Sequence, residues 1–325
     1  MYIAQAFNVL HDWWRYLVGL IIAIIGVGIF SIPHGVAVVM KQMSGTADLE
    51  RMDDINYLMT LFEPNLNLVF ILLPFVGGLI FLLLAVKLLH KQSFTHLTTS
   101  RKKIDWKRFW FVFLLWGILS SGMVLLSYVM SPEDYVLNFN LQPFLILCVL
   151  AIILVPLQTS FEEYLFRGYL MQGIGVIAKN KWITLITTSL VFGLLHIANP
   201  EVEKLGYIIM VYYIGTGLFL GIMTLMDESL ELALGFHAAN NLFTALLVTA
   251  DWTAFQTHSV LKDMSDPTTA GFIDVFMPIF IVFPIVLFIL AKKYNWTNWK
   301  GKLFGRIEVP IKVEQTIIED IGTKI

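Results

Sequence analysis

The sequence has little charge and almost no cysteine. Of its 325 residues 14% are charged, compared with roughly a quarter in an ordinary soluble domain, while 57% are hydrophobic and the mean hydropathy is +0.74. With 24 acidic and 22 basic residues and no long basic run, the charge gives no indication of nucleic-acid binding. The only cysteine, Cys148, excludes an intramolecular disulfide and a two-cysteine metal site, and we expect it to be a buried structural thiol. This composition predicts a membrane protein.

Apolar runs long enough to cross a hydrocarbon core need roughly 20 residues of helix. Eight such runs occur, near 16–32, 66–89, 109–130, 144–178, 182–199, 206–226, 229–250 and 273–291. We therefore predict an all-α fold, a polytopic membrane bundle of about eight transmembrane helices. The run at 144–178 is longer than a membrane needs, so this helix is expected either to tilt and project or to break near Pro156. The first run is not preceded by a positively charged n-region and is not followed by a clear A-x-A cleavage site. We therefore expect that it is not removed as a signal peptide and is retained as a span.

The distribution of basic residues predicts the orientation. If alternate connections lie on opposite sides, one side holds 18 Lys and Arg, and the other holds four: Lys41, Arg51, Lys204 and Lys262. Since basic residues gather on the cytoplasmic side, both termini are predicted to be cytoplasmic. The expected location is the plasma (inner) membrane of a prokaryote.

Two adjacent carboxylates and an arginine interrupt the fourth run, in S-F-E-E-Y-L-F-R-G at 160–168. Charged groups at membrane depth are costly and are usually paired or functional. Glu163 and Arg167 are four residues apart, which favours a helical ion pair, whereas Glu162 points about 100° away around the helix. We therefore predict that Glu163 and Arg167 support the structure and that Glu162 is free for chemistry, unless this turn simply emerges into the cytoplasm.

Two further polar groups lie on later runs. V-F-G-L-L-H places Phe192 and His196 four residues apart, and G-F-H-A-A-N-N places His237 and Asn241 on one helix face. Taken singly, each could be a packing residue or an interhelical hydrogen-bonding residue. A hairpin that turns near Asn180 would place Glu162 and His196 at equal height and facing each other, with His237 and Asn241 at an overlapping height.

Together these side chains are a set of catalytic parts for the hydrolysis of a peptide or amide bond. Glu162 could act as a general base toward water, and His196 could orient that water or carry the proton to the leaving amine. His237 and Asn241 could donate hydrogen bonds to the oxyanion of a tetrahedral intermediate.

The three groups resemble the signature of the CPBP family (CAAX proteases and bacteriocin-processing enzymes, also called ABI), E-E-x-x-x-R, F-x-x-x-H and H-x-x-x-N. The resemblance covers about residues 142–250. It implies an intramembrane glutamic endopeptidase in which Glu162 and His196 activate water and His237 and Asn241 form the oxyanion site. It also implies a membrane-associated protein or peptide substrate, as in CAAX processing or bacteriocin maturation.

This resemblance divides the chain into three parts. Residues 1–141 are expected to form an N-terminal membrane region with three spans and a basic loop at 90–108. Residues 142–250 are expected to form the catalytic core, and residues 251–325 to form an outer loop, the last span and a cytoplasmic tail. The expected partners are the substrate and the lipid bilayer, without nucleic acid, and the oligomeric state is left open.

Other functions remain open from the sequence. His196, His237 and Glu162 could bind zinc as a His₂Glu site, although no H-E-x-x-H motif occurs and no cofactor is expected. The same buried ionisable residues could serve a transporter or a proton relay, although no inverted repeat is visible. A third possibility is a non-catalytic partner-binding protein. Gly217 and Gly221, four residues apart, are expected to allow close helix packing.

Overall fold

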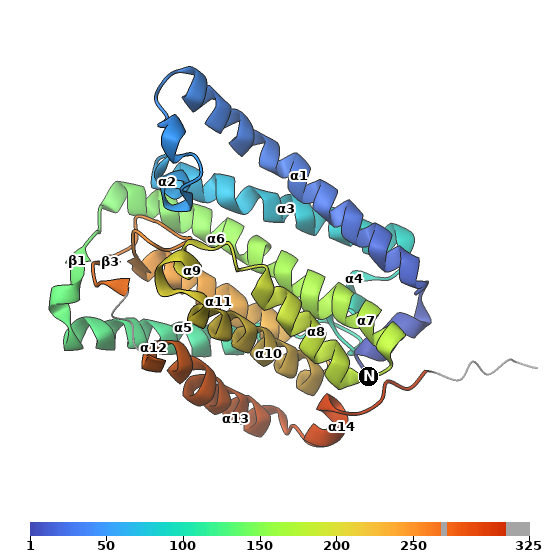
Figure 1. The fold of residues 1–325 in the computed structure, drawn as a ribbon. Coiled ribbons are helices and arrows are strands. Elements are labelled where there is room, and N and C mark those ends of the chain that lie inside the picture. The colour runs from blue at the N-terminus through green and yellow to red at the C-terminus, as the bar shows by residue number, and fades with distance from the viewer. Residues whose placement is uncertain (268–271, 310–325) are drawn as a thin grey trace, which may run out of the picture.

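The computed structural model describes residues 1–267 and 272–309 as a bundle of helices (Figure 1). The N-terminal part contains the short helix η1 (Ile3–Asn8), α1 (Trp13–Met43), η2 (Leu49–Arg51), α2 (Ile55–Thr60), α3 (Pro64–Leu89), α4 (Phe94–Thr98) and α5 (Trp106–Met130). The central part contains η3 (Pro132–Asp134), β1 (Tyr135–Leu137), α6 (Leu141–Glu163), the π-helical segment η4 (Tyr164–Leu170) and α7 (Met171–Ala178).

The remaining elements complete the bundle. They are α8 (Lys181–Leu194), α9 (Pro200–Leu205), η5 (Tyr207–Ile209), α10 (Met210–Asp227), α11 (Glu231–Leu247), β2 (Val248–Thr249), β3 (Leu261–Asp263), α12 (Phe272–Met277), η7 (Pro278–Val282), α13 (Phe283–Tyr294) and α14 (Trp299–Leu303). The three strands form one small sheet in the order β1-β3-β2, antiparallel between β1 and β3 and parallel between β2 and β3.

The bundle has two ends of different character (Figure 1). One end, on the right, holds the N-terminus, α4, the connection from α7 to α8, and α14. The opposite end holds α2, α9, the small sheet and the beginning of α12. We call these the basic end and the acidic end, because 15 of the 20 described Lys and Arg lie at the first, whereas 12 Asp and Glu and only four Lys and Arg lie at the second.

The turn between α7 and α8 is fixed by local chemistry. Lys179 adopts the left-handed conformation (φ 50°) that ends α7, a common way to terminate a helix. Asn180 then caps α8, because its side-chain oxygen accepts the backbone N–H of Ile183 at 3.1 Å. The predicted hairpin turn near Asn180 is therefore confirmed.

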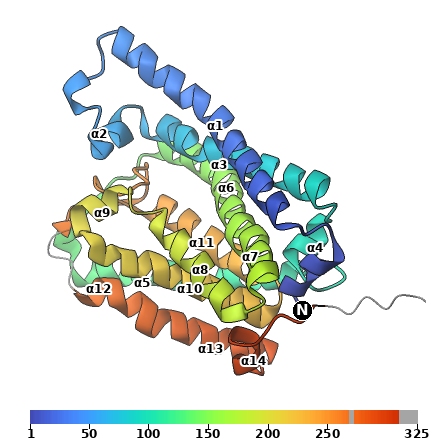
Figure 2. The same cartoon turned by 45° about the vertical axis from the view of Figure 1, so that its right-hand side comes forward.

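The two arms of this hairpin diverge as they leave the turn. Helix α6 packs against α3 and α11, whereas α8 packs along α10 and meets only η4 and α7 from the other arm at the basic end. Figure 2 shows α6 continuing into α7 and α8 returning beside α10. The arms are therefore separated toward the acidic end.

Small residues allow α8 and α10 to approach closely. A Cβ atom on Gly217 would lie 2.8 Å from the Ser189 carbonyl oxygen, and one on Gly221 would lie 2.4 Å from a methyl carbon of Leu185. Both distances are shorter than real contacts allow, so the close packing predicted for these glycines is confirmed.

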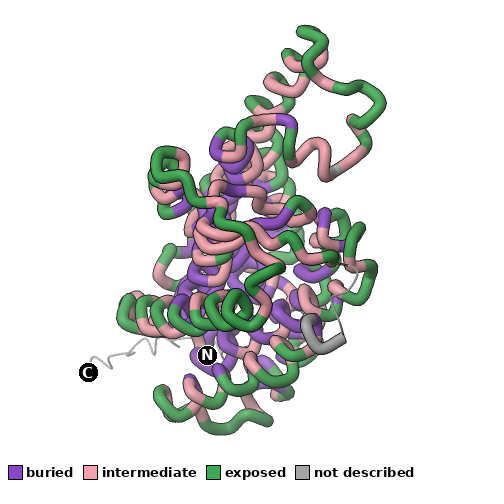
Figure 3. The backbone as a smooth tube through the Cα atoms, turned by 90° about the vertical axis from the view of Figure 1, so that its left-hand side faces the viewer, coloured by how far each residue is buried: buried purple, intermediate pink, exposed green. Residues whose placement is uncertain are grey.

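The apolar surface has the distribution of a membrane protein. Buried backbone runs through the middle of the bundle, while much of the periphery is exposed (Figure 3), and many of the exposed side chains on α1, α5 and α13 are large hydrophobic ones. Within the described residues six helices are long and apolar enough to cross a membrane, those at 13–43, 64–89, 106–130, 141–178, 207–227 and 275–294. The chain is an all-α, polytopic membrane protein.

The structure bears on three details of the sequence predictions. The runs at 182–199 and 229–250 form helices of only 14 and 17 residues, so a count of eight spanning helices is not established. The long fourth helix continues through Pro156 and changes to π geometry directly after Glu163. Cys148 is half-buried rather than buried.

Candidate active site

A pocket of about 760 Å³ lies between the diverging arms of the hairpin and contains all four candidate catalytic residues. Glu162 comes from the last turn of α6, His196 from the turn after α8, and His237 and Asn241 from the middle of α11. Three segments that are distant in the sequence therefore supply one cavity, as the motif spacing predicts.

Glu163 and Arg167 form a fully buried ion pair next to this pocket. Arg167 Nη1 donates to Glu163 Oε1 at 2.9 Å, which is the predicted i,i+4 pair. Arg167 Nη2 also donates to the Gly217 carbonyl on α10 at 3.2 Å, and the Phe192 ring lies 4.1 Å from the guanidinium carbon. These contacts tie η4 to α8 and α10, and they compensate a charge that would be very costly to bury alone.

His237 lies between the two glutamates. Its Nδ1 is 2.8 Å from Glu163 Oε1, and its Nε2 is 3.5 Å from Glu162 Oε2. Because Glu163 Oε1 can only accept, His237 donates the Nδ1 proton to it. Glu163 therefore does more than neutralise Arg167, since it also fixes the orientation of the imidazole that faces Glu162.

Glu162 is held through one oxygen and left free at the other. Gln158, one turn earlier on α6, donates to Glu162 Oε1 at 2.6 Å. Among the described residues Oε2 has no hydrogen-bond partner, and the whole residue is only 9% exposed. A buried carboxylate oxygen without a partner is unusual in folded proteins. Glu163 Oε2 and Glu201 Oε2 share this property, so the position of Glu162 Oε2, 3.5 Å from His237 Nε2, is what makes it the candidate base.

A chain of amides leads to Gln158 from α11. Asn241 Nδ2 donates to Gln158 Oε1 at 3.1 Å, and Asn240 Nδ2 donates to Asn241 Oδ1 at 3.1 Å. Trp116 on α5 donates its indole N–H to Asn240 Oδ1 at 3.1 Å. The predicted residue Asn241 therefore belongs to a hydrogen-bonded chain that ends on Glu162.

His196 occupies a different wall of the pocket. Its Nδ1 lies 2.9 Å from the carbonyl oxygen of Phe192, and its ring stacks on Tyr213 with centroids 4.4 Å apart. Since a carbonyl only accepts, Nδ1 carries the proton and Nε2 is left as the acceptor. In the described part of the chain, no hydrogen bond or ion pair joins His196 to Glu162.

Glu162 and His196, predicted to face each other across the hairpin, both line the pocket but are joined by no hydrogen bond or ion pair among the described residues. The imidazole beside Glu162 is His237, because α8 diverges from α6 after the turn and ends before His196. Equal height along two helices does not bring side chains into contact when the helices separate.

Sequence reasoning missed four residues of this site: Gln158, Asn240, Trp116 and Tyr213. Gln158 had a detectable signal, because a polar residue one helical turn before Glu162 lies on the same helix face. The other three act through contacts between distant segments, and no local pattern distinguishes them.

The possible zinc ligands do not converge. His237 and Glu162 approach each other, but His196 stands apart from them. Among the residues that the structure describes, no group of three His, Cys, Asp or Glu is placed to hold a metal ion.

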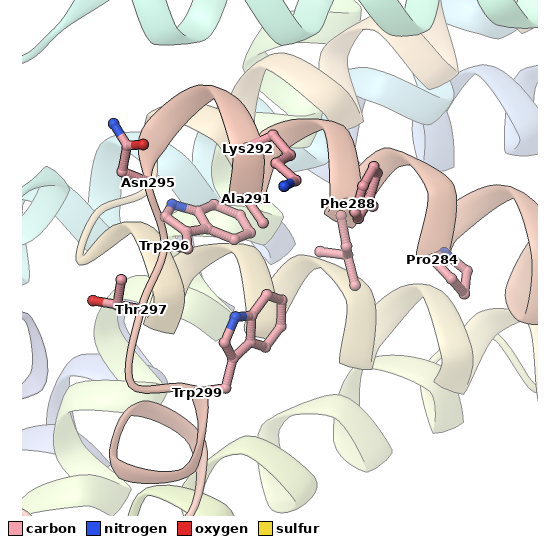
Figure 4. Close-up of a pocket in the computed structure, with 9 residues that line it drawn as sticks. Pro284, Phe288, Ala291, Lys292, Asn295, Trp296, Thr297 and Trp299 are labelled. Carbon is pink, nitrogen blue, oxygen red and sulfur yellow. The ribbon is translucent and has the colours of Figure 1, made fainter.

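A second cavity, of about 600 Å³, lies at the basic end of α13. Figure 4 shows its lining, which includes Phe288, Lys292, Trp296 and Trp299. It contains none of the residues singled out above, and such aromatic and lysine side chains are typical of a membrane–water interface.

Comparisons with known proteins show a family similarity over the segment that carries the candidate residues. Residues 141–243 match the family model described as type II CAAX prenyl endopeptidase Rce1-like. The chain is also 38% identical over 168 residues to the uncharacterized protein YyaK of Bacillus subtilis (strain 168), an alignment that covers 51% of this chain and 56% of YyaK. The chain therefore matches little more than half the length of that curated relative, and no solved structure matches. The segment that matches the Rce1-like family model contains Glu162, His196, His237 and Asn241, whereas part of the pocket lining, such as Ile71 and Thr253, lies outside it.

Proposed function

We propose that this protein is an intramembrane endopeptidase in which Glu162 activates water. The observation that carries the proposal is the buried, unpartnered Oε2 of Glu162, 3.5 Å from an imidazole, in a pocket of about 760 Å³. A general base has to reach the proton that it removes, and Glu162 lines the cavity in which water and the scissile bond would lie.

In the proposed reaction, Glu162 Oε2 takes a proton from water while the water oxygen attacks the carbonyl carbon of the scissile peptide bond. The C–N bond of the resulting tetrahedral intermediate then breaks, and the leaving nitrogen receives the proton that Glu162 took from water, which returns Glu162 to its ionised form. His196 is suited to pass that proton, because its Nδ1–H is donated to Phe192 and its Nε2 is free to accept.

His237 and Asn241 are proposed to stabilise the oxyanion of the intermediate. To donate to the oxyanion through Nε2, the His237 ring has to carry protons on both nitrogens while Nδ1 remains bonded to Glu163. The side-chain amide of Asn241 has a second N–H besides the one bonded to Gln158, and this proton is available to the oxyanion.

The substrate class follows from the family only at a coarse level. The Rce1-like match favours a peptidase acting on membrane-associated protein or peptide substrates. CAAX-type and bacteriocin-type processing both remain within this proposal.

A comparison of membrane peptide profiles tests the proposal. Membranes that contain the wild-type protein should yield cleavage products that are absent with Glu162→Gln, a variant of nearly the same shape. Glu162→Gln should be as abundant as wild type, since it leaves the buried ion pair of Glu163 and Arg167 intact. Identical profiles at equal abundance would contradict the proposal.

A chelator distinguishes the zinc alternative. If Glu162 activates water without a metal, cleavage should be unchanged after dialysis against EDTA. Loss of cleavage that zinc restores would instead favour the metal-dependent mechanism.

A further inference from the structure

The pocket extends mainly to one side of Glu162. Its walls come from the first half of α3, from α6 and the start of η4 around Glu162, from the end of α8, from α9 and the start of α10, from α11 after its first turn and from residues 248–255. Leu165 and Phe166 follow Glu162 toward the basic end, whereas most of the other lining residues lie toward the acidic end. The cavity is therefore directed to that end.

The way from Glu162 to the basic end is filled by packed side chains. Glu162 is 16 residues from the end of α7, about 24 Å along the helix. Buried hydrophobic residues occupy this part of the bundle, among them Tyr164, Phe166, Tyr169, Met171, Leu185 and Leu230. A polypeptide could not reach Glu162 from the basic end without unfolding this core.

Charge asymmetry orients the bundle in the membrane. The basic end holds Arg15, Lys87, Lys91, Arg101, Lys102, Lys103, Lys107, Arg108, Lys179, Lys181, Lys292, Lys293, Lys300, Lys302 and Arg306, whereas the acidic end holds only Lys41, Arg51, Lys204 and Lys262. Figure 4 shows Lys292 with Trp296 and Trp299 at the basic end of α13, as expected for an interface. This asymmetry, by the positive-inside rule, places the basic end in the cytoplasm and the acidic end outside.

The wall of the pocket shows what it can accept. Leu195 lines the pocket and is 66% exposed, so the wall that follows α8 presents an apolar side chain on the outside of the bundle. Two further carboxylates, Glu201 and Asp263, line the outer part of the cavity, and no lysine or arginine is among its described lining residues. A free C-terminal carboxylate would find no cationic partner there.

We propose that the pocket is loaded from the extracytoplasmic half of the membrane, and that its substrates are membrane-anchored segments exposed on that side rather than C-terminal tails of cytoplasmic proteins. This inference rests on the proposed peptidase function and specifies where its substrates are found. It requires that water-soluble reagents outside the cell reach the pocket wall.

Cysteine labelling tests the side of access without any substrate. The full chain with Cys148→Ser would carry one new cysteine: Thr253→Cys in the pocket wall, Glu203→Cys on the exposed face of α9, or Lys102→Cys in the basic loop. Spheroplasts would be treated with a membrane-impermeant maleimide before and after permeabilisation. Thr253→Cys and Glu203→Cys should react at least ten times faster than Lys102→Cys in intact spheroplasts, and Lys102→Cys should become reactive only after permeabilisation.

Two results would overturn the proposal. Reaction of Lys102→Cys in intact spheroplasts, with Glu203→Cys protected, would place the acidic end in the cytoplasm. Reaction of Glu203→Cys with Thr253→Cys protected would show that the pocket is closed to the outside. Because labelling needs no cleavage, failure of the peptidase proposal would appear only in the peptide profiles with Glu162→Gln.

Discussion

The buried pair of Glu163 and Arg167 permits a quantitative test of how the site is supported. Glu163→Gln removes the negative charge but retains the shape, and it leaves a cation that is 0% exposed. Removing one partner of a buried ion pair typically costs about 3–5 kcal/mol. The contacts of Arg167 with the Gly217 carbonyl and the Phe192 ring persist in the variant, and the new amide oxygen can still accept a hydrogen bond, so we expect a loss near the lower value, ~3 kcal/mol.

The free energy of unfolding in mixed micelles, measured by SDS titration of the purified protein, gives this number. Glu162→Gln is the matched control, because it leaves the pair of Glu163 and Arg167 intact, and it should cost less than about 1 kcal/mol. Combining Glu163→Gln with Arg167→Met should recover part of the loss, with a coupling energy of about 2 kcal/mol. Equal losses in the two glutamine variants, or a double-mutant cycle without coupling, would refute the reasoning.

Three further predictions concern neighbouring residues. Gln158→Leu should lower cleavage at least tenfold with little change in expression, because Glu162 loses the donor that fixes its Oε1. Gly217→Leu should destabilise the protein by about 3 kcal/mol or more in the SDS titration, because its side chain would overlap the Ser189 carbonyl. Burial raises the pKa of Glu201 above its ordinary value, so Glu201→Gln should raise the melting temperature at pH 8, and this gain should vanish below about pH 4.

The sign of the Glu201 effect follows from linkage. A raised pKa means that the folded protein binds this proton more tightly than the unfolded chain does, so ionisation at high pH costs stability. Below the pKa of the unfolded chain the carboxyl is protonated in both states and resembles the amide of the variant. A gain for Glu201→Gln that grew as the pH fell would contradict the assignment.

For Gln158→Leu, wild-type cleavage would show that Gln158 does not position Glu162. For Gly217→Leu, wild-type stability would show that α8 and α10 can separate at little cost.

The roles of the two glutamates were separable by helical spacing alone. A separation of four residues places Arg167 on the same helix face as Glu163 and leaves Glu162 about 100° away, and the ion pair at 2.9 Å agrees. Spacing could not show that Glu163 also binds His237, because this contact joins residues 74 positions apart. Glu163 therefore has a second role besides the predicted one. Glu163→Gln leaves Arg167 without its carboxylate partner and also removes the carboxylate that orients the His237 ring beside Glu162.

The sequence by itself determined the membrane class, the helical fold, the hairpin turn at Lys179 and Asn180, and the residues that gather in the pocket. These properties depend on composition, helical periodicity and local capping, which are all written along the chain. Only the tertiary structure decided which imidazole lies beside Glu162, that Gln158 holds it, and that the cavity is directed to the acidic end. These properties depend on the angle between α6 and α8, which is set by packing between distant helices and by the π-helical segment after Glu163.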